Sequence, residues 1–511
     1  MDKIEIHAFL ISLFILSLII NYIYFSSNKT AIQIVDDMGL GYNIGKTYNC
    51  CSSVDEENIL YEQIKTWGTI LPNKKMIKKI KKYGFKTIRF QILYTNLTDI
   101  SNSEWLIRVK EIVDRIIKEG MYCILSVYQD REFWISEGKK SKDNYINFWK
   151  QIANQFIDND EHLIFESLSE IYLNIEYLNI LNITQYFINT IRSSDGLNKE
   201  RLLIIPEMNT ELEINDYYKL ELPKDPSNKT AVSIQYYFPS EPLNEYGGDS
   251  LIWNDKFGYI YDGIPITKWG SAYDYKEILN KIEMFKRIFI DKGIPIIFSE
   301  VGILSRFNNI TSPNREFLYT LFSLTKEING IMACLWDNSE KISENNNYYN
   351  RETDTWNDEI TQKIINKISK DKGEKISDYY ITTNSEVVVS YLNFFYSNIA
   401  NKKLLKVTIN AKIYENGIIG IDFDIIITSY DIDGWNNILI FVKKEDGKKE
   451  YDGTISYIVD VSNENLNKEV YIMSWGDDKY LSINNVTFEF KENFPYFDYI
   501  SYKNSILKDI F

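Results

Sequence analysis

A pattern of apolar runs and amphipathic segments recurs between residues 33 and 370, and it constrains the fold more than any other feature. In each repeat, a short apolar run precedes a segment whose apolar residues recur about every 3.6 residues, the period of a helix. The apolar runs are predicted strands at residues 38–45, 85–90, 121–128, 162–170, 201–207, 230–238, 294–300 and 330–338. Such a series of strand–helix units predicts an α/β fold, a (β/α)8 TIM barrel over residues 31–372.

Glycines mark the ends of the predicted helices. The segments 73–84, 107–120 and 274–293 each end in glycine, and each glycine leads into the next predicted strand. The strands are continuously apolar, as expected for a parallel sheet that is buried on both faces. A closed barrel is therefore favoured over an open sheet.

The pattern changes beyond a boundary near residues 371–385. From residue 386 onward, polar and apolar residues alternate in short runs that are separated by turn sequences such as "DGK" and "GDD". This alternation predicts an antiparallel β-sandwich over residues 386–511. Trp435 and Trp475 in this region fit either the sandwich core or a carbohydrate-binding face, and the sequence leaves both open.

Length, charge and the N-terminus limit the classes of function. The chain has 511 residues and a formal net charge of −15, so several domains are expected and nucleic acid is excluded as a partner. The apolar run at residues 7–25 predicts a signal peptide or signal-anchor within residues 1–30. The protein is thus expected to be secreted, or anchored in a membrane through residues 8–25 with its domains outside the cytoplasm. No cysteine or histidine spacing indicates a metal, and no cofactor is predicted.

Two glutamates stand where the chemistry of such a barrel is expected, at the C-terminal ends of strands. Glu170 and Glu300 end the fourth and seventh predicted strands, which lie on opposite parts of the ring, so both face one cleft. Carboxyl groups about 5–5.5 Å apart support glycoside hydrolysis with retention, in which one is the nucleophile and the other the general acid and base. Arg89, at the end of the second strand, would favour the ionised form of the nucleophile.

Eleven short motifs between about residues 33 and 365 resemble, in their order, the cellulase family, glycoside hydrolase family 5, and in particular its secreted endo-β-glucanases. The motifs are MGLGYNIGKTYN, YEQIKTWGT, MIKKIKKYGFKTIRF, GMYCILSVYQD, LIFESLSE, RLLIIPEMNTEL, SIQYYFPSEP, TKWGSAYDYKEI, GIPIIFSEVG, CLWDNS and YNRETDTW. The resemblance implies a (β/α)8 fold and retaining hydrolysis of a β-linked polysaccharide of the cellulose, β-glucan or xyloglucan type. It further implies Glu170 as acid/base, Glu300 as nucleophile, Arg89 as its helper, Tyr237 as the active-site tyrosine and Trp336 as a sugar platform.

Three positions depart from the family pattern. Ser169 precedes Glu170 where the family usually has Asn, Tyr128–Gln129 stands in place of His-His, and Gln235 replaces the first His of His-Tyr-Tyr. Glutamine donates a hydrogen bond but carries no proton at neutral pH, and serine reaches less far than asparagine. Gln129, Ser169 and Gln235 are therefore expected to lie at the substrate site. The rate of hydrolysis is expected to be reduced, because these side chains replace the usual residues of the family.

These departures leave two alternatives to a working hydrolase. One is a catalytically impaired glycan-binding pseudoenzyme at the cell surface or among secreted proteins, and the other is an adhesive surface protein held by an N-terminal anchor.

Neither histidine of the chain is expected to contribute to the site. His7 lies in the leader, and His162 lies about eight residues before Glu170, near the opposite end of the barrel.

Overall fold

The computed structural model forms two compact units, one from the described residues of Met1–Tyr237, Glu283–Asn308 and Leu318–Gly373, the other from those of Phe238–Ile282, Asn309–Phe317 and Glu374–Phe511. The structure describes residues 29–49, 59–67, 70–93, 100–101, 103–128, 139–169, 177–206, 221–238, 251–254, 258–261, 264–265, 272–303, 312–337, 348–370, 375–388, 394–399, 402–414, 417–420, 422–430, 439–451, 453–464, 466, 469–476 and 480–510.

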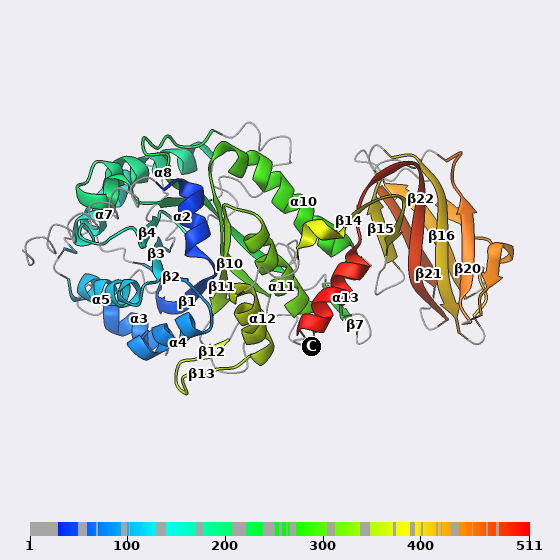
Figure 1. Ribbon diagram of the computed structural model, residues 1–511, viewed down its shortest axis with the longest axis horizontal. Helices are drawn as coiled ribbons and strands as arrows, with labels where there is room; N and C mark the ends of the chain where they lie inside the picture. The colour runs from blue at the N-terminus through cyan, green and yellow to red at the C-terminus, as the bar shows by residue number, and fades with distance from the viewer. Residues whose placement is uncertain are drawn as a thin grey trace, which may run out of the picture. The chain divides into compact units, whose positions relative to one another are not determined.

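The predicted barrel is confirmed. The barrel and the helices around it are shown in Figure 1. Its strands form a closed ring in the order β1-β11-β10-β6-β5-β4-β3-β2. They are β1 (Gly41–Tyr48), β2 (Thr87–Ile92), β3 (Tyr122–Val127), β4 (Leu163–Glu166), β5 (Leu203–Pro206), β6 (Thr230–Phe238), β10 (Ile296–Ile303) and β11 (Ile331–Asp337). Every predicted apolar run therefore overlaps a strand of the barrel.

Helices follow the strands, and their capping residues agree with the sequence signals. They are α3 (Ile59–Trp67), α4 (Lys74–Lys82), α5 (Glu104–Lys118), α7 (Lys139–Gln155), α8 (Tyr177–Arg192), α10 (Ala272–Ile288), α11 (Ser312–Glu327) and α12 (Glu359–Lys370). The Asn73 side chain caps α4 by accepting hydrogen bonds from the main-chain N–H groups of Lys75 and Met76. Gly84, Gly120 and Gly293 follow their helices with positive φ angles of 109°, 70° and 85°, which explains why glycine stands there.

One helix was not predicted, and it closes one end of the barrel. Helix α2 (Ala31–Met38) begins at Thr30, whose hydroxyl forms a capping box with Gln33. Its buried face joins one cluster with residues near the starts of the barrel strands: Ala31, Ile34, Val35, Met38, Tyr122, Ile124, Ile164, Leu202, Ile204, Ala231, Ile297, Met332 and Cys334. The first strand consequently starts at Gly41 instead of residue 38. The N-terminal end of the barrel is apolar and sealed.

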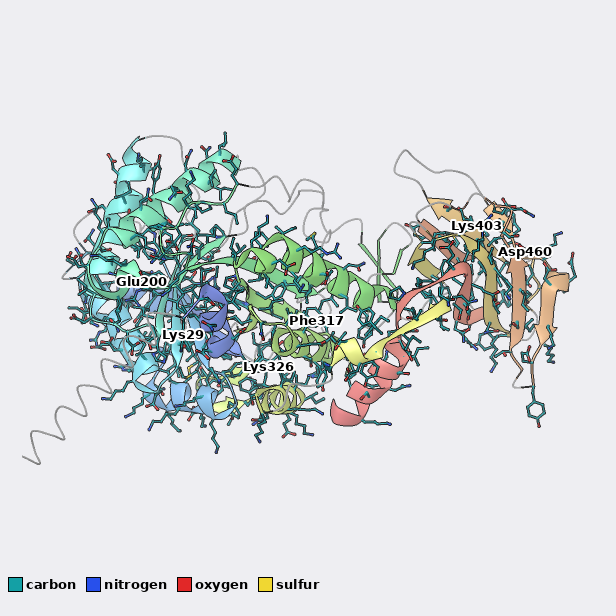
Figure 2. All side chains as sticks on the ribbon, turned by 45° about the horizontal axis from the view of Figure 1, so that its top comes forward. Lys29, Glu200, Phe317, Lys326, Lys403 and Asp460 are labelled. Carbon is teal, nitrogen blue, oxygen red and sulfur yellow. The ribbon has the colours of Figure 1, made fainter. Side chains whose placement is uncertain are left out.

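The second unit contains the predicted antiparallel sandwich. One sheet has the order β14-β22-β16-β20-β19 and the other β15-β21-β17-β18. The strands are β14 (Tyr380–Val388), β15 (Phe394–Asn398), β16 (Leu404–Ile413), β17 (Phe423–Tyr430), β18 (Leu439–Phe441), β19 (Gly447–Lys449), β20 (Ile455–Asp460), β21 (Glu469–Gly476) and β22 (Leu481–Phe497). Burial alternates along β16, where Val407, Ile409 and Ala411 are buried, while Lys403 and Asp460 at strand ends are exposed (Figure 2).

Two further elements of this unit were not predicted. The connection after β6 forms a small antiparallel sheet of β7 (Leu251–Asn254), β8 (Gly258–Tyr261) and β9 (Ile264–Pro265). The chain ends in helix α13 (Tyr499–Ile510), where the Lys503 ammonium lies 3.6 Å from the Glu316 carboxylate. The side chains of Trp435 and Trp475 lie outside the described residues, so their role stays a prediction.

The N-terminal prediction is not tested. Within the described ranges, none of the helices combines the length and apolarity that a bilayer crossing requires. The signal or anchor was predicted within residues 1–30, and its apolar run at residues 7–25 lies outside those ranges.

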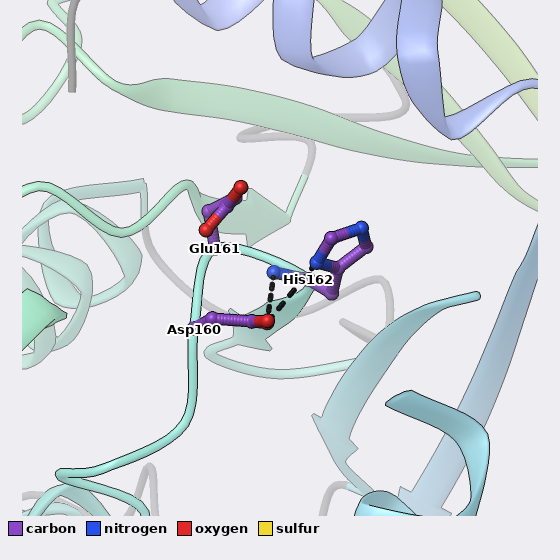
Figure 3. A group of neighbouring side chains, drawn as sticks. All are labelled: Asp160, Glu161 and His162. Carbon is purple, nitrogen blue, oxygen red and sulfur yellow. Dashed lines mark hydrogen bonds and ion pairs between the residues drawn. The ribbon is translucent and has the colours of Figure 1, made fainter. Parts of the chain in front are cut away.

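The histidine before β4 is bound to a neighbouring aspartate. The Asp160 carboxylate accepts hydrogen bonds from the main-chain N–H and from Nδ1 of His162, at 3.0 Å and 3.1 Å (Figure 3). The hydrogen bond to Asp160 raises the pKa of His162, although partial burial opposes it. Glu161 lies beside them, and one ligand atom from each of the three residues lies within 4.8 Å of the others. The two hydrogen bonds account for the close approach of Asp160 and His162.

The Asp160–His162 pair predicts a pH-dependent stability. Because the folded pKa of His162 is raised above 6.5, protonated His162 stabilises the fold fully below that pH, and this contribution is lost as pH rises through the folded pKa. His162→Gln should therefore lower Tm at about pH 5.5 by an amount equivalent to less than about 1 kcal/mol, since the pair is partly exposed. The difference should shrink by about pH 9. Thermal melts across this range test it, and a Tm difference independent of pH would contradict it.

Candidate active site

Arg89 on β2 is the centre of a buried polar layer inside the barrel. Its guanidinium donates from Nε to Glu166 at 2.5 Å and from Nη2 to Glu166 at 3.1 Å. Nη1 donates to Asn43 at 3.0 Å and to Glu300 at 2.8 Å, and Nη2 also donates to Ser126 at 3.2 Å. All five N–H groups of the arginine are thus satisfied without water. The side chain is completely buried.

Strand register places these partners around Arg89. Asn43 on β1 lies directly opposite Arg89 on β2, and Ser126 on β3 lies opposite Glu166 on β4. Because side chains alternate along a strand, residues at these positions point to the same face of the sheet, here the barrel interior. The layer lies toward the C-terminal strand ends, above the apolar cluster that contains α2.

Glu300 reaches this layer from an irregular part of β10. The pairing of β10 with β11 shifts register between Phe298 and Val301, so Ser299 and Glu300 form a bulge. A bulge bends the strand and redirects its side chains, which is common next to active sites. Asn43 fixes the bulge, since its Nδ2 donates to the Ser299 carbonyl at 2.7 Å and its Oδ1 accepts from Arg89. The Glu300 carboxylate is 3% exposed.

The two carboxylates determine the electrostatics of the layer. Burial alone would lower the pKa of Arg89, but Glu166 and Glu300 outweigh it and raise that pKa above its usual value. Arg89 therefore stays charged and forms ion pairs with both carboxylates. Burial raises the pKa of the nearby Cys334 thiol to about 12, so this cysteine is neutral and is no nucleophile.

Trp336 lies over the first strand at the end of β11. A side-chain carbon at Gly45 would lie 3.1 Å from the Trp336 ring and 2.6 Å from the Asp337 carbonyl, so only glycine allows this approach. The Asp337 carboxylate is fully buried and accepts hydrogen bonds from the Tyr42 hydroxyl and from the Tyr349 main chain. Trp336 itself is partly exposed, as a stacking platform requires.

Gln235 on β6 contacts Ser169, which lies three residues after the end of β4. The Gln235 side-chain amide donates to the Ser169 carbonyl at 3.3 Å. The Ser169 hydroxyl is buried and has no hydrogen-bond partner among the described residues. An unpaired buried hydroxyl is unfavourable, so this group is suited to bind a polar ligand.

The structure thus brings Arg89 and Glu300 together. It places Gln235 on β6 in contact with Ser169, which follows β4, and it places Trp336 near the end of β11. Two of the predicted residues, Glu170 and Gln129, lie outside the described residues, and of Tyr237 only the main chain, in β6, is described. The roles given to these residues stay predictions.

Sequence reasoning missed Glu166, Asn43 and Gln91. Glu166 had a usable signal, because a carboxylate inside the apolar run "LIFES" needs a cationic partner if it is buried. It lies two residues after the inward-facing Ile164, on the same face. Asn43 and Gln91 gave no comparable signal, since their hydrogen bonds depend on register between strands.

Comparison with known proteins decides the family. The family model described as cellulase, glycosyl hydrolase family 5, matches residues 51–342, which is more than half of the chain. The chain belongs to this family. It is a glycoside hydrolase that acts on O-glycosyl bonds and resembles endo-β-1,4-glucanases.

Three similar proteins illustrate the relationship. Endoglucanase A of Paenibacillus barcinonensis is 27% identical over 373 residues, covering 66% of this chain and 89% of that protein. The structure of a GH5-4 broad specificity endoglucanase from an uncultured bovine rumen ciliate is 39% identical, with a TM-score of 0.59 over 67% of this chain and 99% of that one. A lichenase mutant of Caldicellulosiruptor sp. F32, complexed with cellotetraose, is 25% identical, with a TM-score of 0.55 over 67% of this chain and 95% of that one.

The buried ion pair of Arg89 with Glu166 predicts strong energetic coupling. Arg89→Met should lower the free energy of unfolding by roughly 3–5 kcal/mol, because it leaves the buried carboxylates of Glu166 and Glu300 without their cation. Adding Glu166→Met removes one of these carboxylates, so the double variant should be more stable than the sum of the two single losses predicts, by about 1–3 kcal/mol. Urea denaturation of the wild type, the two single variants and the double variant measures this coupling energy. Additive losses would contradict the pairing.

Proposed function

We propose that the barrel hydrolyses β-1,4-linked glucan chains of the cellulose, β-glucan or xyloglucan type with retention of configuration. The observation that carries the proposal is the Glu300 carboxylate, held in the bulge of β10 by Arg89 at 2.8 Å in a family-5 barrel. A carboxylate kept ionised in this way is suited to attack an anomeric carbon. Two of the relatives reported above, an endoglucanase and a lichenase with bound cellotetraose, support a β-glucan as substrate.

In the proposed mechanism, Glu300 is the nucleophile and Glu170 the general acid. A Glu300 oxygen forms an ester with the anomeric carbon as the glycosidic C–O bond breaks, and Glu170 gives its proton to the leaving oxygen. In the second step, the Glu170 carboxylate takes a proton from a water molecule whose oxygen attacks the anomeric carbon. The ester bond breaks, and Glu300 leaves as a carboxylate.

Ser169 and Trp336 are the proposed substrate contacts among the described residues. The unpaired Ser169 hydroxyl gains a hydrogen-bond partner when a sugar hydroxyl binds, and the partly exposed Trp336 ring offers a face for a pyranose. Contacts to the hydroxyls of the reacting sugar strengthen in the transition state. Serine reaches less far than asparagine, so the proposed enzyme is slower than a relative with asparagine there.

The apolar run at residues 7–25 supports export of the protein, with the barrel and the sandwich acting outside the cytoplasm. A soluble polysaccharide substrate is consistent with that location. Intact-mass analysis of the secreted chain would distinguish a cleaved signal from an uncleaved anchor.

The hydrolase proposal predicts that Glu300→Gln abolishes activity. Release of reducing ends from carboxymethyl-cellulose, barley β-glucan and xyloglucan should fall by about 10³-fold or more, because the amide is a poor nucleophile. Glu316→Gln is the matched control, since Glu316 is a buried glutamate paired with Lys503, and it should retain activity.

A wild-type protein that is silent on all three polysaccharides would refute hydrolysis. Substitution of the family residues by Ser169, Gln129 and Gln235 would then favour the alternative, a glycan-binding protein. Calorimetric binding of cellotetraose without turnover would support that alternative.

A further inference from the structure

A second donor besides Arg89 binds the predicted nucleophile. Gln91 lies on β2 two residues after Arg89, so both side chains point into the barrel. Its Nε2 donates to Oε1 of Glu300 at 2.8 Å, the same oxygen that accepts from Arg89. Gln91 is 2% exposed, so this hydrogen bond forms away from bulk water and is strengthened by the charge of the carboxylate.

A chain of hydrogen bonds fixes which end of the Gln91 amide faces Glu300. The main-chain N–H of Thr47 can only donate, and it donates to Oδ1 of Asn49 at 3.3 Å. Asn49 therefore presents its Nδ2 to Gln91 and donates to the Gln91 Oε1 at 2.9 Å. With its oxygen taken, Gln91 can only offer its N–H group to Glu300. The polarity of this chain is thus set by the backbone.

A bulge in β1 brings Asn49 to this position. Ile44 pairs with Phe90 and Tyr48 pairs with Ile92, so β1 has two extra residues between these pairs. Lys46 within the bulge has a positive φ of 46°, which is uncommon for a lysine. Arg351 holds the bulge by donating to the Gly45 carbonyl at 2.8 Å and to the Thr47 hydroxyl at 3.1 Å. The arrangement is built from several independent contacts.

We propose that Gln91 and Asn49 are positioning residues for the hydrolytic reaction: they hold Oε1 of Glu300 and direct its Oε2 to the anomeric carbon. This inference rests on the proposed function of Glu300 as nucleophile. Hydrogen bonds to a carboxylate favour its charged form. The same bonds stabilise Glu300 as the departing group in the second step, when the ester breaks.

A purely structural role makes a different prediction. If Gln91 only filled the barrel interior, replacing it would lower stability and leave the ionisation of Glu300 unchanged. The test therefore needs a measurement that reports on the charge of Glu300.

The first experiment compares the pH dependence of kcat/KM on β-glucan in the wild type and in Gln91→Met. Methionine keeps the length of the side chain but removes the donor. The acidic limb of the profile should move upward by about one pH unit, which is about a tenfold loss of kcat/KM on that limb. KM at the pH optimum should change little, because Gln91 acts through Glu300.

The second experiment tests whether Asn49 acts through Gln91. Asn49→Leu should shift the acidic limb in the same direction by a smaller amount, because the Gln91 amide loses the bond that orients it. The double variant with Gln91→Met should shift no further than Gln91→Met alone, since Asn49 has nothing left to orient. Additive shifts would overturn the relay.

Asn198→Leu is the matched control. Asn198 is a fully buried amide that donates to the Ala153 carbonyl and accepts from Arg201, away from the polar layer. Its replacement should lower Tm and leave the acidic limb in place. If Gln91→Met lowers Tm and likewise leaves the limb unmoved, Gln91 is only structural and the inference fails.

A measurement without turnover separates this inference from the hydrolase proposal. In protein labelled with ¹³C at glutamate carboxyl carbons, the Glu300 resonance is the one missing in Glu300→Gln, and its titration can be followed by NMR. The midpoint should be about one pH unit higher in Gln91→Met than in the wild type, even if no glucan is hydrolysed. An inactive wild type would refute the hydrolase, whereas an unchanged midpoint would refute the role of Gln91.

Discussion

The guanidinium of Arg89 inside the barrel is the interaction on which the candidate site depends. A buried cation is tolerated only when its charge and every donor are matched, and here two carboxylates, an asparagine and a serine match them. These partners come from four other strands of the ring, β1, β3, β4 and β10, so the arginine links strands that are distant in sequence. The same contact that stabilises the interior fixes the position of the Glu300 carboxylate. Stability and proposed reactivity therefore share one group.

The barrel interior is divided into layers of different polarity. Toward the strand starts, α2 and the first residues of the strands form an apolar cluster. Above it lies the polar layer around Arg89, and the partly exposed Trp336 lies opposite Asn43 of this layer in the register of β1 and β11. Because the lower end is sealed and apolar, the charged layer has no access to water from that side, and electrostatic interactions within it are stronger than at a surface. The hydrogen-bonded pair of Asp160 and His162 lies at the start of β4 and is not part of this layer.

Sequence patterns predicted the elements of the fold better than the contacts of the site. Apolar runs located all eight barrel strands, since buried parallel strands need continuous apolar sequence, and glycines located helix ends. Helices α2 and α13 were missed: α2 is only eight residues long, and α13 followed a region of strand-like alternation. Arg89 and Glu300 were identified because they stand near the ends of predicted strands, although in the structure β2 continues to Ile92 and β10 to Ile303. Gln91 and Glu166 were not, because their partners depend on register and on a bulge, which no periodicity in the sequence reveals.

The contact of Arg351 with the bulge of β1 has a consequence for folding. Arg351 and the Gly45 carbonyl are 306 positions apart in the chain, and Asn43 contacts Ser299 across 256 positions. Such distant contacts form late, because closing the long loops between them costs conformational entropy. That cost is offset only when the two ends are in contact. During synthesis, β1 can therefore make these contacts only after the last segment of the barrel has been synthesised. The polar layer is completed as a final event of folding, so a partly made chain has the glutamates but lacks the geometry that would make one of them a nucleophile.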